Sequence, residues 1–147
     1  MRNIVAAILR TDFGLEVKTD GEGKGNLPLR EAVKLIKGSR LAVEFHTNAA
    51  VNKTATGIEA LSTPKNKAAC QRLCRAVEQA TGWKLRGEDG YKPDNAGQHS
   101  RLVYAQAGGI IFEPFFISND ADLAQWKQTR WSICRAIANA IAEEVKA

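Results

Sequence analysis

The sequence has no long hydrophobic run, so it offers no candidate for a transmembrane helix. No apolar stretch approaches the roughly 18 residues that spanning a bilayer requires. Residues 1–14 carry one arginine before a short apolar patch, which Arg10, Thr11 and Asp12 then interrupt. A signal peptide needs a longer apolar core and a small-residue cleavage site. The sequence therefore predicts synthesis in the cytoplasm, with no export signal and no membrane insertion.

Cysteine is also scarce, with three residues in a chain of 147. This odd count excludes a framework in which every cysteine is paired in a disulfide. Cys70 and Cys74 are four residues apart, which places them on the same face of a helix, but the nearby sequence lacks further metal ligands. We therefore predict buried, reduced thiols and a reducing compartment during synthesis.

The composition is neither that of a disordered chain nor that of a strongly basic one. Hydrophobic residues make up 44% and charged residues 25%, as in soluble globular proteins, and the length suits one domain, residues 1–147. The net charge of +5 favours polyanions such as nucleic acid, an anionic cell wall or a membrane surface. However, the basic residues are scattered, and the tryptophans lie at ends or faces of predicted helices rather than within a basic patch. Nucleic acid is therefore not the expected partner, and no oligomeric state is predicted.

Helical and strand-like patterns alternate along the chain. Apolar residues at helical spacing predict helices at residues 3–10, 28–38, 66–81 and 120–147. Alternating or continuous apolar runs predict strands at residues 15–19, 41–46, 57–61, 101–105 and 109–116. Polar, glycine-rich loops are expected at residues 20–26, 47–56 and 86–100. This alternation is typical of an α/β domain with a largely parallel sheet, in which ligands bind at the carboxyl ends of the strands.

Two side chains suited to catalysis lie at predicted strand ends. His46 closes one strand, and Glu113 ends an apolar run before Pro114, which cannot continue a central strand. The apolar surroundings of Glu113 predict a desolvated carboxyl group with a raised pKa. Such a glutamate beside a metal-bound water is the usual general base in metal-assisted hydrolysis. The structural alternatives are that His46 only caps its strand, and that Glu113 caps the next helix or pairs with a lysine.

Three further polar residues are weaker candidates. Asn48 is suited either to an oxyanion contact or to holding the turn after its strand, and the turn is the simpler assignment. Glu59 lies on a short predicted strand, where an exposed position is the plain interpretation. His99 is the only other histidine, and as a loop residue it is expected to be solvated.

Several spaced motifs occur in a characteristic order along nearly the whole chain. They are the segment around Arg30, His46-Thr47-Asn48, Gly57-Ile58-Glu59, Arg86-Gly87, Glu113 and Phe116-Ile117-Ser118-Asn119. This series resembles the zinc-dependent N-acetylmuramoyl-L-alanine amidases of the amidase-3 type. The resemblance implies a three-layer α/β fold, with a mostly parallel twisted sheet flanked by helices. It also implies cleavage of the amide between N-acetylmuramic acid and L-alanine in peptidoglycan.

The resemblance further implies roles for the two strand-end residues. His46 corresponds to one zinc ligand of the family. Glu113 corresponds to the catalytic glutamate, which activates the zinc-bound water and passes its proton to the leaving amine. Zn²⁺ is thus the implied cofactor and peptidoglycan the implied partner. A bacterial cell-wall amidase or a phage endolysin fits this description, and the lack of an export signal suits an endolysin that host-cell lysis machinery releases to the wall.

The sequence departs from the family at its N-terminus. Family members begin with a strand that ends in a Gly-His-Gly-like sequence, followed by a glutamate that opens the first helix, and these supply the other two zinc ligands. Here Met1 falls within the first helix, so we expect an N-terminally truncated amidase-like catalytic domain that lacks the family's first strand. Three explanations stay open: a fragment or internal start, a non-catalytic relative that binds cell-wall fragments or a partner, and a rearranged site in which His99 supplies a substitute ligand.

Overall fold

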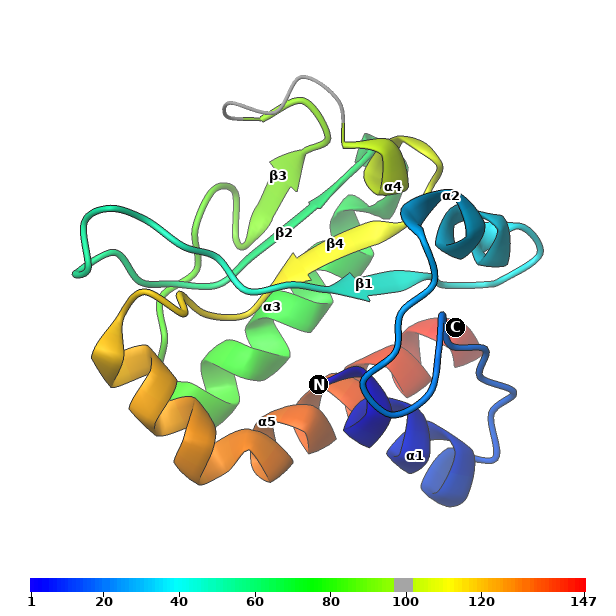
Figure 1. Cartoon of the computed structure of the whole chain (residues 1–147), viewed down its shortest axis with the longest axis horizontal. Coiled ribbons are helices and arrows are strands. Elements are labelled where there is room, and N and C mark those ends of the chain that lie inside the picture. Colours follow the sequence, from blue (N-terminus) through cyan, green and yellow to red (C-terminus); the bar gives the residue numbers. More distant parts are fainter. Residues whose placement is uncertain (97–101) are drawn as a thin grey trace.

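A four-stranded mixed sheet forms the centre of the computed structural model, which describes residues 1–96 and 102–147 (Figure 1). The strands are β1 (Val43–Phe45), β2 (Glu59–Ser62), β3 (Tyr91–Pro93) and β4 (Ile110–Glu113). Their order is β1-β4-β2-β3, with β1/β4 and β2/β3 parallel and β2/β4 antiparallel. Two of the three pairings are parallel, which confirms the expected α/β class with a mostly parallel sheet.

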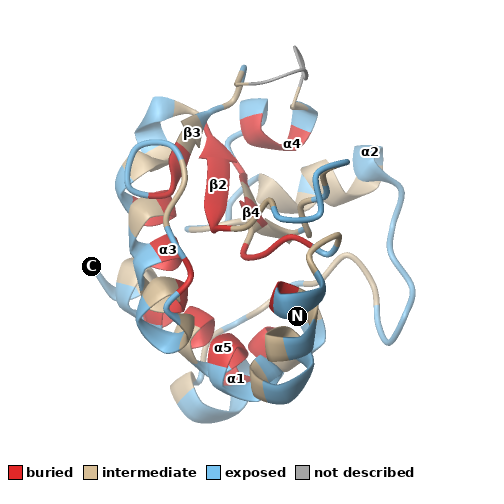
Figure 2. Cartoon of the chain, turned by 90° about the vertical axis from the view of Figure 1, so that its left-hand side faces the viewer, coloured by how far each residue is buried: buried red, intermediate tan, exposed pale blue. Residues whose placement is uncertain are grey.

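Helices flank both faces of this sheet. The α-helices described are α1 (Arg2–Phe13), α2 (Leu29–Ala32), α3 (Lys67–Thr81), α4 (Val103–Gln106) and α5 (Asp120–Lys146), and the 3-10 turns are Val33–Ile36 and Pro64–Asn66. Helices α3 and α5 pack against each other on one face, with α1 beside α5, and α2 and α4 lie on the other (Figure 2). The result is the three-layer arrangement that the family resemblance implies. None of the described helices has the length and hydrophobicity that a membrane span needs.

The hydrophobic core lies between the sheet and the layer of long helices. Ile133, Ile137 and Ile141 form the buried stripe of α5, as its periodicity predicts, and Phe112 of β4 is fully buried against the same cluster. Each such side chain contributes roughly 1.5–3 kcal/mol on burial. Trp131 lies outside this stripe, with 62% of its surface exposed.

All three cysteines belong to this core as free thiols, which confirms the prediction of buried, reduced residues. Burial raises the pKa of the Cys70 thiol to about 12 and raises that of Cys74 further. Thiols with such high pKa values stay protonated and unreactive. The cysteines therefore serve packing, not chemistry.

Two predicted strands are wrong, and the first is the segment 15–19. Gly14 ends α1 in the left-handed conformation (φ 64°), and residues 15–19 beyond it pair with none of the strands in the described part of the chain. Leu15 and Val17 pack against the core, while the Val17 carbonyl accepts a hydrogen bond from Arg10 (2.6 Å). The alternating pattern thus reflects a segment whose residues are alternately half-buried and exposed, without strand pairing among the described residues.

The second wrong strand is 101–105, of which Arg101 lies outside the described residues. Val103–Gln106 form α4, with Tyr104 and Ala105 buried. The Tyr104 ring packs on Gly109, where an added Cβ would lie 2.2 Å from a ring carbon. A short apolar run is compatible with either a strand or a helix, and the aromatic ring over Gly109 favours the helical turn.

The predicted helix at 28–38 is also less regular than expected. It consists of α2 and the 3-10 turn Val33–Ile36, and none of its residues is fully buried. Its apolar positions are half-buried or exposed, because this segment covers the rim of the sheet and not the main core. The predicted loop 86–100 contains β3, so it is not wholly irregular.

The long helix α5 begins at a side-chain cap. Asn119 Oδ1 accepts hydrogen bonds from the backbone N–H groups of Ala121 (2.9 Å) and Asp122 (3.1 Å), and Asn119 Nδ2 donates to the Ala55 carbonyl (3.2 Å). These bonds satisfy N–H groups that have no partner within the helix. They also tie the start of α5 to the loop that follows β1.

We expect Asn119→Ala to lower the free energy of unfolding by about 1–2 kcal/mol, because the cap and its loop contact are both lost. Urea denaturation measures this difference. Asn139→Ala, an exposed change on the same helix, is the matched control and is expected to stay within about 0.5 kcal/mol of the unsubstituted chain. Equal losses in the two variants would contradict the capping role.

Candidate active site

The parallel pairing of β1 and β4 brings His46 and Glu113 together at one edge of the sheet. His46 follows β1, and its backbone N–H donates to the Phe112 carbonyl of β4 (2.9 Å), while Glu113 ends β4. His46 Nδ1 lies 3.7 Å from Glu113 Oε1, and His46 Nε2 lies 3.6 Å from Glu44 Oε1. Glu44 and His46 share a face because side chains alternate along a strand. Both predicted site residues thus meet at the carboxyl ends of parallel strands.

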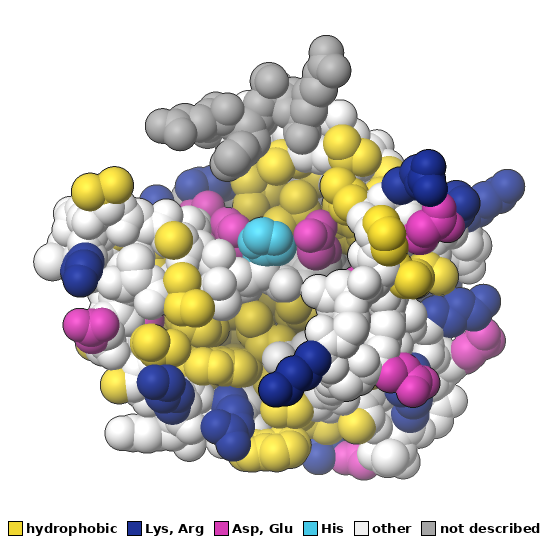
Figure 3. Space-filling model, viewed as in Figure 1, with side chains coloured by type: hydrophobic (Ala, Val, Ile, Leu, Met, Phe, Trp, Pro, Cys, Tyr) yellow, Lys and Arg dark blue, Asp and Glu magenta, His cyan; other side chains and the backbone are white. Residues whose placement is uncertain are grey.

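These side chains lie in a cleft of about 390 Å³. Its polar lining consists of Glu44, His46, Asn48, Glu59, Lys92 and Glu113, and its apolar lining consists of Leu29, Leu61, Ala96, Leu102, Val103, Tyr104 and Ile111. Figure 3 shows the histidine between acidic side chains, beside a hollow lined by hydrophobic ones. A concave, largely apolar pocket with a few converging polar groups is typical of a substrate site.

Glu113 has an unusual proton affinity because of its position in the sheet. It is 16% exposed and lies directly opposite Glu59 in the antiparallel β2/β4 pair. Burial raises the pKa of Glu113, and the charge of Glu59 and a hydrogen bond with it raise that pKa further, to about 7. This agrees with the predicted desolvated carboxyl group. A carboxyl group that titrates near neutral pH is able both to accept and to release a proton there.

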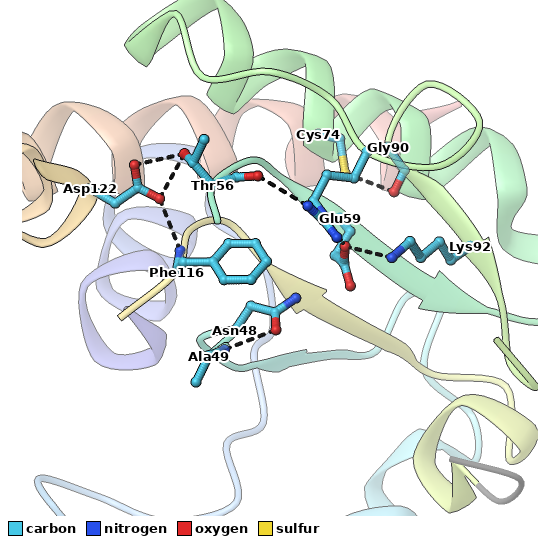
Figure 4. Close-up of polar contacts among 10 residues, drawn as sticks. Asn48, Ala49, Thr56, Glu59, Cys74, Gly90, Lys92, Phe116 and Asp122 are labelled. Atoms are coloured by element: carbon cyan, nitrogen blue, oxygen red, sulfur yellow. Dashed lines mark hydrogen bonds and ion pairs between the residues drawn. The ribbon is translucent and has the colours of Figure 1, made fainter. Parts of the chain in front are cut away.

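Glu59 is buried, with 5% of its surface exposed, so its interpretation as an exposed strand residue is wrong. Two cations contact the same carboxylate oxygen, Oε2: Arg86 Nε at 2.5 Å and Lys92 Nζ at 2.8 Å. Figure 4 shows the contact between Glu59 and Lys92. A buried charge needs such partners, because the loss of hydration is otherwise uncompensated. The three side chains form an ion cluster, of which Glu59 and Lys92 line the cleft.

Two glycines leave room for the cations of this cluster. A Cβ on Gly57 would lie 2.8 Å from Arg86 Cγ, and a Cβ on Gly87 would lie 2.8 Å from Lys92 Cγ. Both glycines have positive φ angles, 116° and 61°, which other residues rarely adopt. The motifs Gly57-Ile58-Glu59 and Arg86-Gly87 therefore pack directly against each other. These glycines are the sequence signal that could have placed Glu59 inside the fold.

Asn48 holds the turn after β1, as the simpler assignment predicts. Its Oδ1 accepts a hydrogen bond from the Ala49 N–H (2.9 Å) (Figure 4). Its backbone N–H donates to the Phe115 carbonyl (3.0 Å), and its own carbonyl accepts from the Ile117 N–H (2.8 Å). The loop that follows His46 is thereby fixed to the segment that follows Glu113.

A buried carboxylate, Asp122, joins the same segment to α5. It accepts hydrogen bonds from the Thr56 hydroxyl (2.8 Å) and from the Phe116 N–H (3.2 Å). Arg86 also donates to the Thr56 carbonyl (3.2 Å) and lies over the Phe116 ring, 4.9 Å from its centroid. Thr56 and Phe116 therefore contact both Arg86 of the ion cluster and Asp122 of α5.

The described side chains do not fit a complete catalytic zinc site. Among residues 1–96 and 102–147, no group of three or more His, Cys, Asp or Glu side chains is placed to hold a metal ion. A catalytic zinc uses three protein ligands and one open position. His99, the substitute ligand in one of the three explanations left open by the sequence, lies outside the described residues. In the described part of the chain, His46 is a single imidazole, 55% exposed and flanked by two carboxyl groups.

The structure is an α/β domain with a cleft at its strand ends, in which a histidine lies beside carboxyl groups. Residues 1–143 match the family model described as N-acetylmuramoyl-L-alanine amidase. The chain belongs to this family, and its function is that of a peptidoglycan amidase. The match confirms the resemblance of the spaced motifs to N-acetylmuramoyl-L-alanine amidases.

Solved structures show the same fold. A Neisseria meningitidis protein to which N-acetylmuramoyl-L-alanine amidase activity has been attributed is 77% identical, with a TM-score of 0.93 over 99% of this chain and 80% of that one. The amidase AmiC2 of Nostoc punctiforme is 18% identical (TM-score 0.82, 99% and 80% covered). The catalytic domain of CwlV from Bacillus (Paenibacillus) polymyxa is 20% identical (TM-score 0.73, 98% and 80% covered). No curated protein matches this sequence.

Proposed function

We propose that this cleft is the active site of a zinc-dependent amidase that cleaves the bond between N-acetylmuramic acid and L-alanine, with Glu113 as its acid–base group. One observation carries the proposal: a carboxyl group with a pKa of about 7 lies 3.7 Å from the imidazole that the family resemblance assigns to the metal. General acid–base catalysis is most effective when the pKa of the group lies near the working pH.

Glu113 serves both halves of amide hydrolysis in this proposal. Its ionised form takes a proton from the attacking water as the water oxygen adds to the amide carbonyl carbon. Its protonated form then gives that proton to the alanine nitrogen as the C–N bond breaks. Glu59 supports this cycle, because its nearby negative charge keeps the pKa of Glu113 high. The apolar side of the cleft excludes other water molecules from the reacting bond.

We further propose Zn²⁺ as the cofactor and His46 as one of its ligands. A zinc ion held there would supply Lewis acidity toward the amide carbonyl and would lower the pKa of a bound water. A catalytic zinc has three protein ligands. The proposal therefore requires two ligands in addition to His46, and the described residues do not bring such a group together.

We propose that a further strand pairs with the free edge of β1 and carries the two additional zinc ligands. β1 is an end strand that pairs only with β4 among the described residues, and Val43 and Phe45 on it are only half-buried. A strand paired with this edge covers both side chains and ends beside His46. The resemblance implies a first strand that ends in a zinc ligand, without naming the strand that it pairs with.

Zinc content and peptidoglycan hydrolysis, measured on the same preparations, test these assignments. We expect near-stoichiometric zinc in the purified protein, and loss of both zinc and hydrolysis in His46→Ala. His99→Ala is the matched control: it keeps its zinc unless His99 is the substitute ligand. Unchanged zinc content and activity in His46→Ala would contradict the ligand assignment.

A second candidate function rests on the incomplete metal site. A non-catalytic amidase-fold protein binds cell-wall fragments without cutting them, and the lack of a three-ligand cluster among the described residues favours this alternative. Its signature is co-sedimentation with peptidoglycan in the absence of bound zinc and of hydrolysis. Release as an endolysin stays a prediction from the sequence.

A further inference from the structure

A second hollow of the molecule lies between α1 and α5, and we call it the α1/α5 groove. Its volume is about 510 Å³, and its lining consists of Ile8, Trp131, Ser132, Arg135, Ala136 and Asn139. Helices α1 and α5 cover one face of the sheet, whereas α2 and α4, which contribute to the cleft, lie on the other (Figure 2). The groove is therefore separate from the cleft that holds His46 and Glu113.

Trp131 forms an exposed aromatic wall of this groove. It has 62% of its surface exposed, although the removal of an indole from water is favourable. Arg135, one turn further along α5, lines the same groove, together with the exposed Ser132 and Asn139. A flat apolar ring beside hydroxyl, amide and guanidinium groups suits a sugar, because a sugar ring has apolar C–H faces and a rim of hydroxyl groups.

The surface of α5 around the groove is basic. Between residues 123 and 142 the helix carries three exposed cations, Lys127, Arg130 and Arg135, and no acidic residue. Asp12 of α1 pairs with Arg135. Among the described residues, neither Lys127 nor Arg130 forms an ion pair. With Asp12 counted, this surface stays positive, and it attracts anionic partners.

Cleavage of the amide between N-acetylmuramic acid and L-alanine creates a ligand that is both a sugar and an anion. Water supplies the hydroxyl group that joins the carbonyl carbon of N-acetylmuramic acid and the proton that joins the alanine nitrogen. At neutral pH the glycan strand thus gains a carboxylate at each cut bond, and the released peptide gains an ammonium group. A basic groove attracts the first product and repels the second.

A membrane surface fits the same face of α5 less well. A helix that lies in a membrane surface buries a continuous apolar face. Within the described residues, Trp131 is the one large hydrophobic side chain of α5 that is exposed, and polar side chains flank it in the groove. A glycan strand uses both kinds of group.

We infer that the α1/α5 groove binds peptide-free glycan strands, with Trp131 against a sugar ring and Arg135 on the carboxylate of N-acetylmuramic acid. A guanidinium group has five N–H donors, so Arg135 is able to contact this carboxylate while it keeps its pair with Asp12. Contacts at the cleft and at the groove then hold the protein on one polymer more strongly than either does alone. The inference rests on the proposed cleavage, and it does not depend on the metal.

Peptide-free glycan strands of defined length test it in two forms, one with free carboxylates and one with these groups reduced to alcohols. Calorimetry on the unsubstituted chain is expected to show about 10-fold tighter binding of the free-acid form. Trp131→Ala is expected to weaken binding of both forms about 10-fold, whereas Trp131→Tyr keeps a stacking ring and stays within about 3-fold. Arg135→Gln is expected to lower the preference for the free acid to about 2-fold or less. Arg75→Gln, a change in another exposed arginine–aspartate pair outside the groove, is the matched control and keeps the preference.

Three results would overturn the inference: equal or no binding of the two forms by the unsubstituted chain, full binding by Trp131→Ala, or an unchanged preference in Arg135→Gln. Vesicles of phosphatidylglycerol and phosphatidylcholine are titrated in parallel. If Trp131→Ala lost vesicle binding but kept strand binding, the groove would belong to a membrane surface and the inference would be wrong. Failure of the proposed function shows separately, as no release of peptides from intact peptidoglycan, because the strands carry no bond to L-alanine.

Discussion

Glu113→Gln is expected to lower peptidoglycan hydrolysis by about 10²–10⁴-fold, the usual contribution of a general acid–base residue. Glutamine has nearly the same shape as glutamic acid but neither takes up nor releases a proton. Its amide group is able to donate a hydrogen bond to Glu59, as the protonated Glu113 does, so the fold is expected to stay intact. Release of free amino groups from purified peptidoglycan measures the effect.

Glu88→Gln provides the matched control for this substitution. Glu88 is an exposed acid that pairs with Lys67 outside the cleft. Hydrolysis by the Glu88 variant is expected to stay within about 2-fold of the unsubstituted chain, since an exposed pair contributes little. Retained hydrolysis in Glu113→Gln, with an intact fold, would show that another group carries the proton.

Arg86→Met is expected to have the largest effect on stability among the changes near the cleft. It leaves the buried Glu59 with Lys92 alone and removes the contacts with the Thr56 carbonyl and the Phe116 ring. Breaking a buried pair by removing one partner costs about 3 kcal/mol or more. Urea denaturation, followed by tryptophan fluorescence, gives the difference in the free energy of unfolding.

Arg75→Met is the control for this experiment, because Arg75 pairs with Asp89 on the surface (2.9 Å) with both side chains more than half exposed. Such a pair contributes about 0–1 kcal/mol. Similar losses in the two arginine variants would mean that burial of Glu59 does not depend on its guanidinium partner.

The long elements of this fold are readable from the sequence, and the short ones are not. The stripe of Ile133, Ile137 and Ile141 repeats over enough turns to define α5. The runs 15–19 and 101–105 are too short for their period to separate a strand from a helical turn or an irregular segment. β3 was missed for a related reason: Tyr91–Pro93 has no apolar run, and its strand character comes from pairing with β2.

Some residues of the candidate site can likewise be predicted from the local sequence, and others cannot. His46 and Glu113 stand out because each ends an apolar run, a local pattern that points to the carboxyl edge of a sheet. Glu59 looks like a surface residue, because its burial depends on Arg86 and Lys92, which lie 27 and 33 residues further along the chain. Only the fold brings these charges together. Gly57 and Gly87 indicate close packing, but the sequence does not show which side chains pack against them.

Mass spectrometry of the products from a defined muramoyl peptide tests the central claim most directly. The unsubstituted chain, loaded with zinc, is expected to release free N-acetylmuramic acid and a peptide with a new L-alanine N-terminus, and Glu113→Gln is expected to release neither. Cleavage at any other bond, or the same products from Glu113→Gln, would contradict the assignment of this cleft and of Glu113.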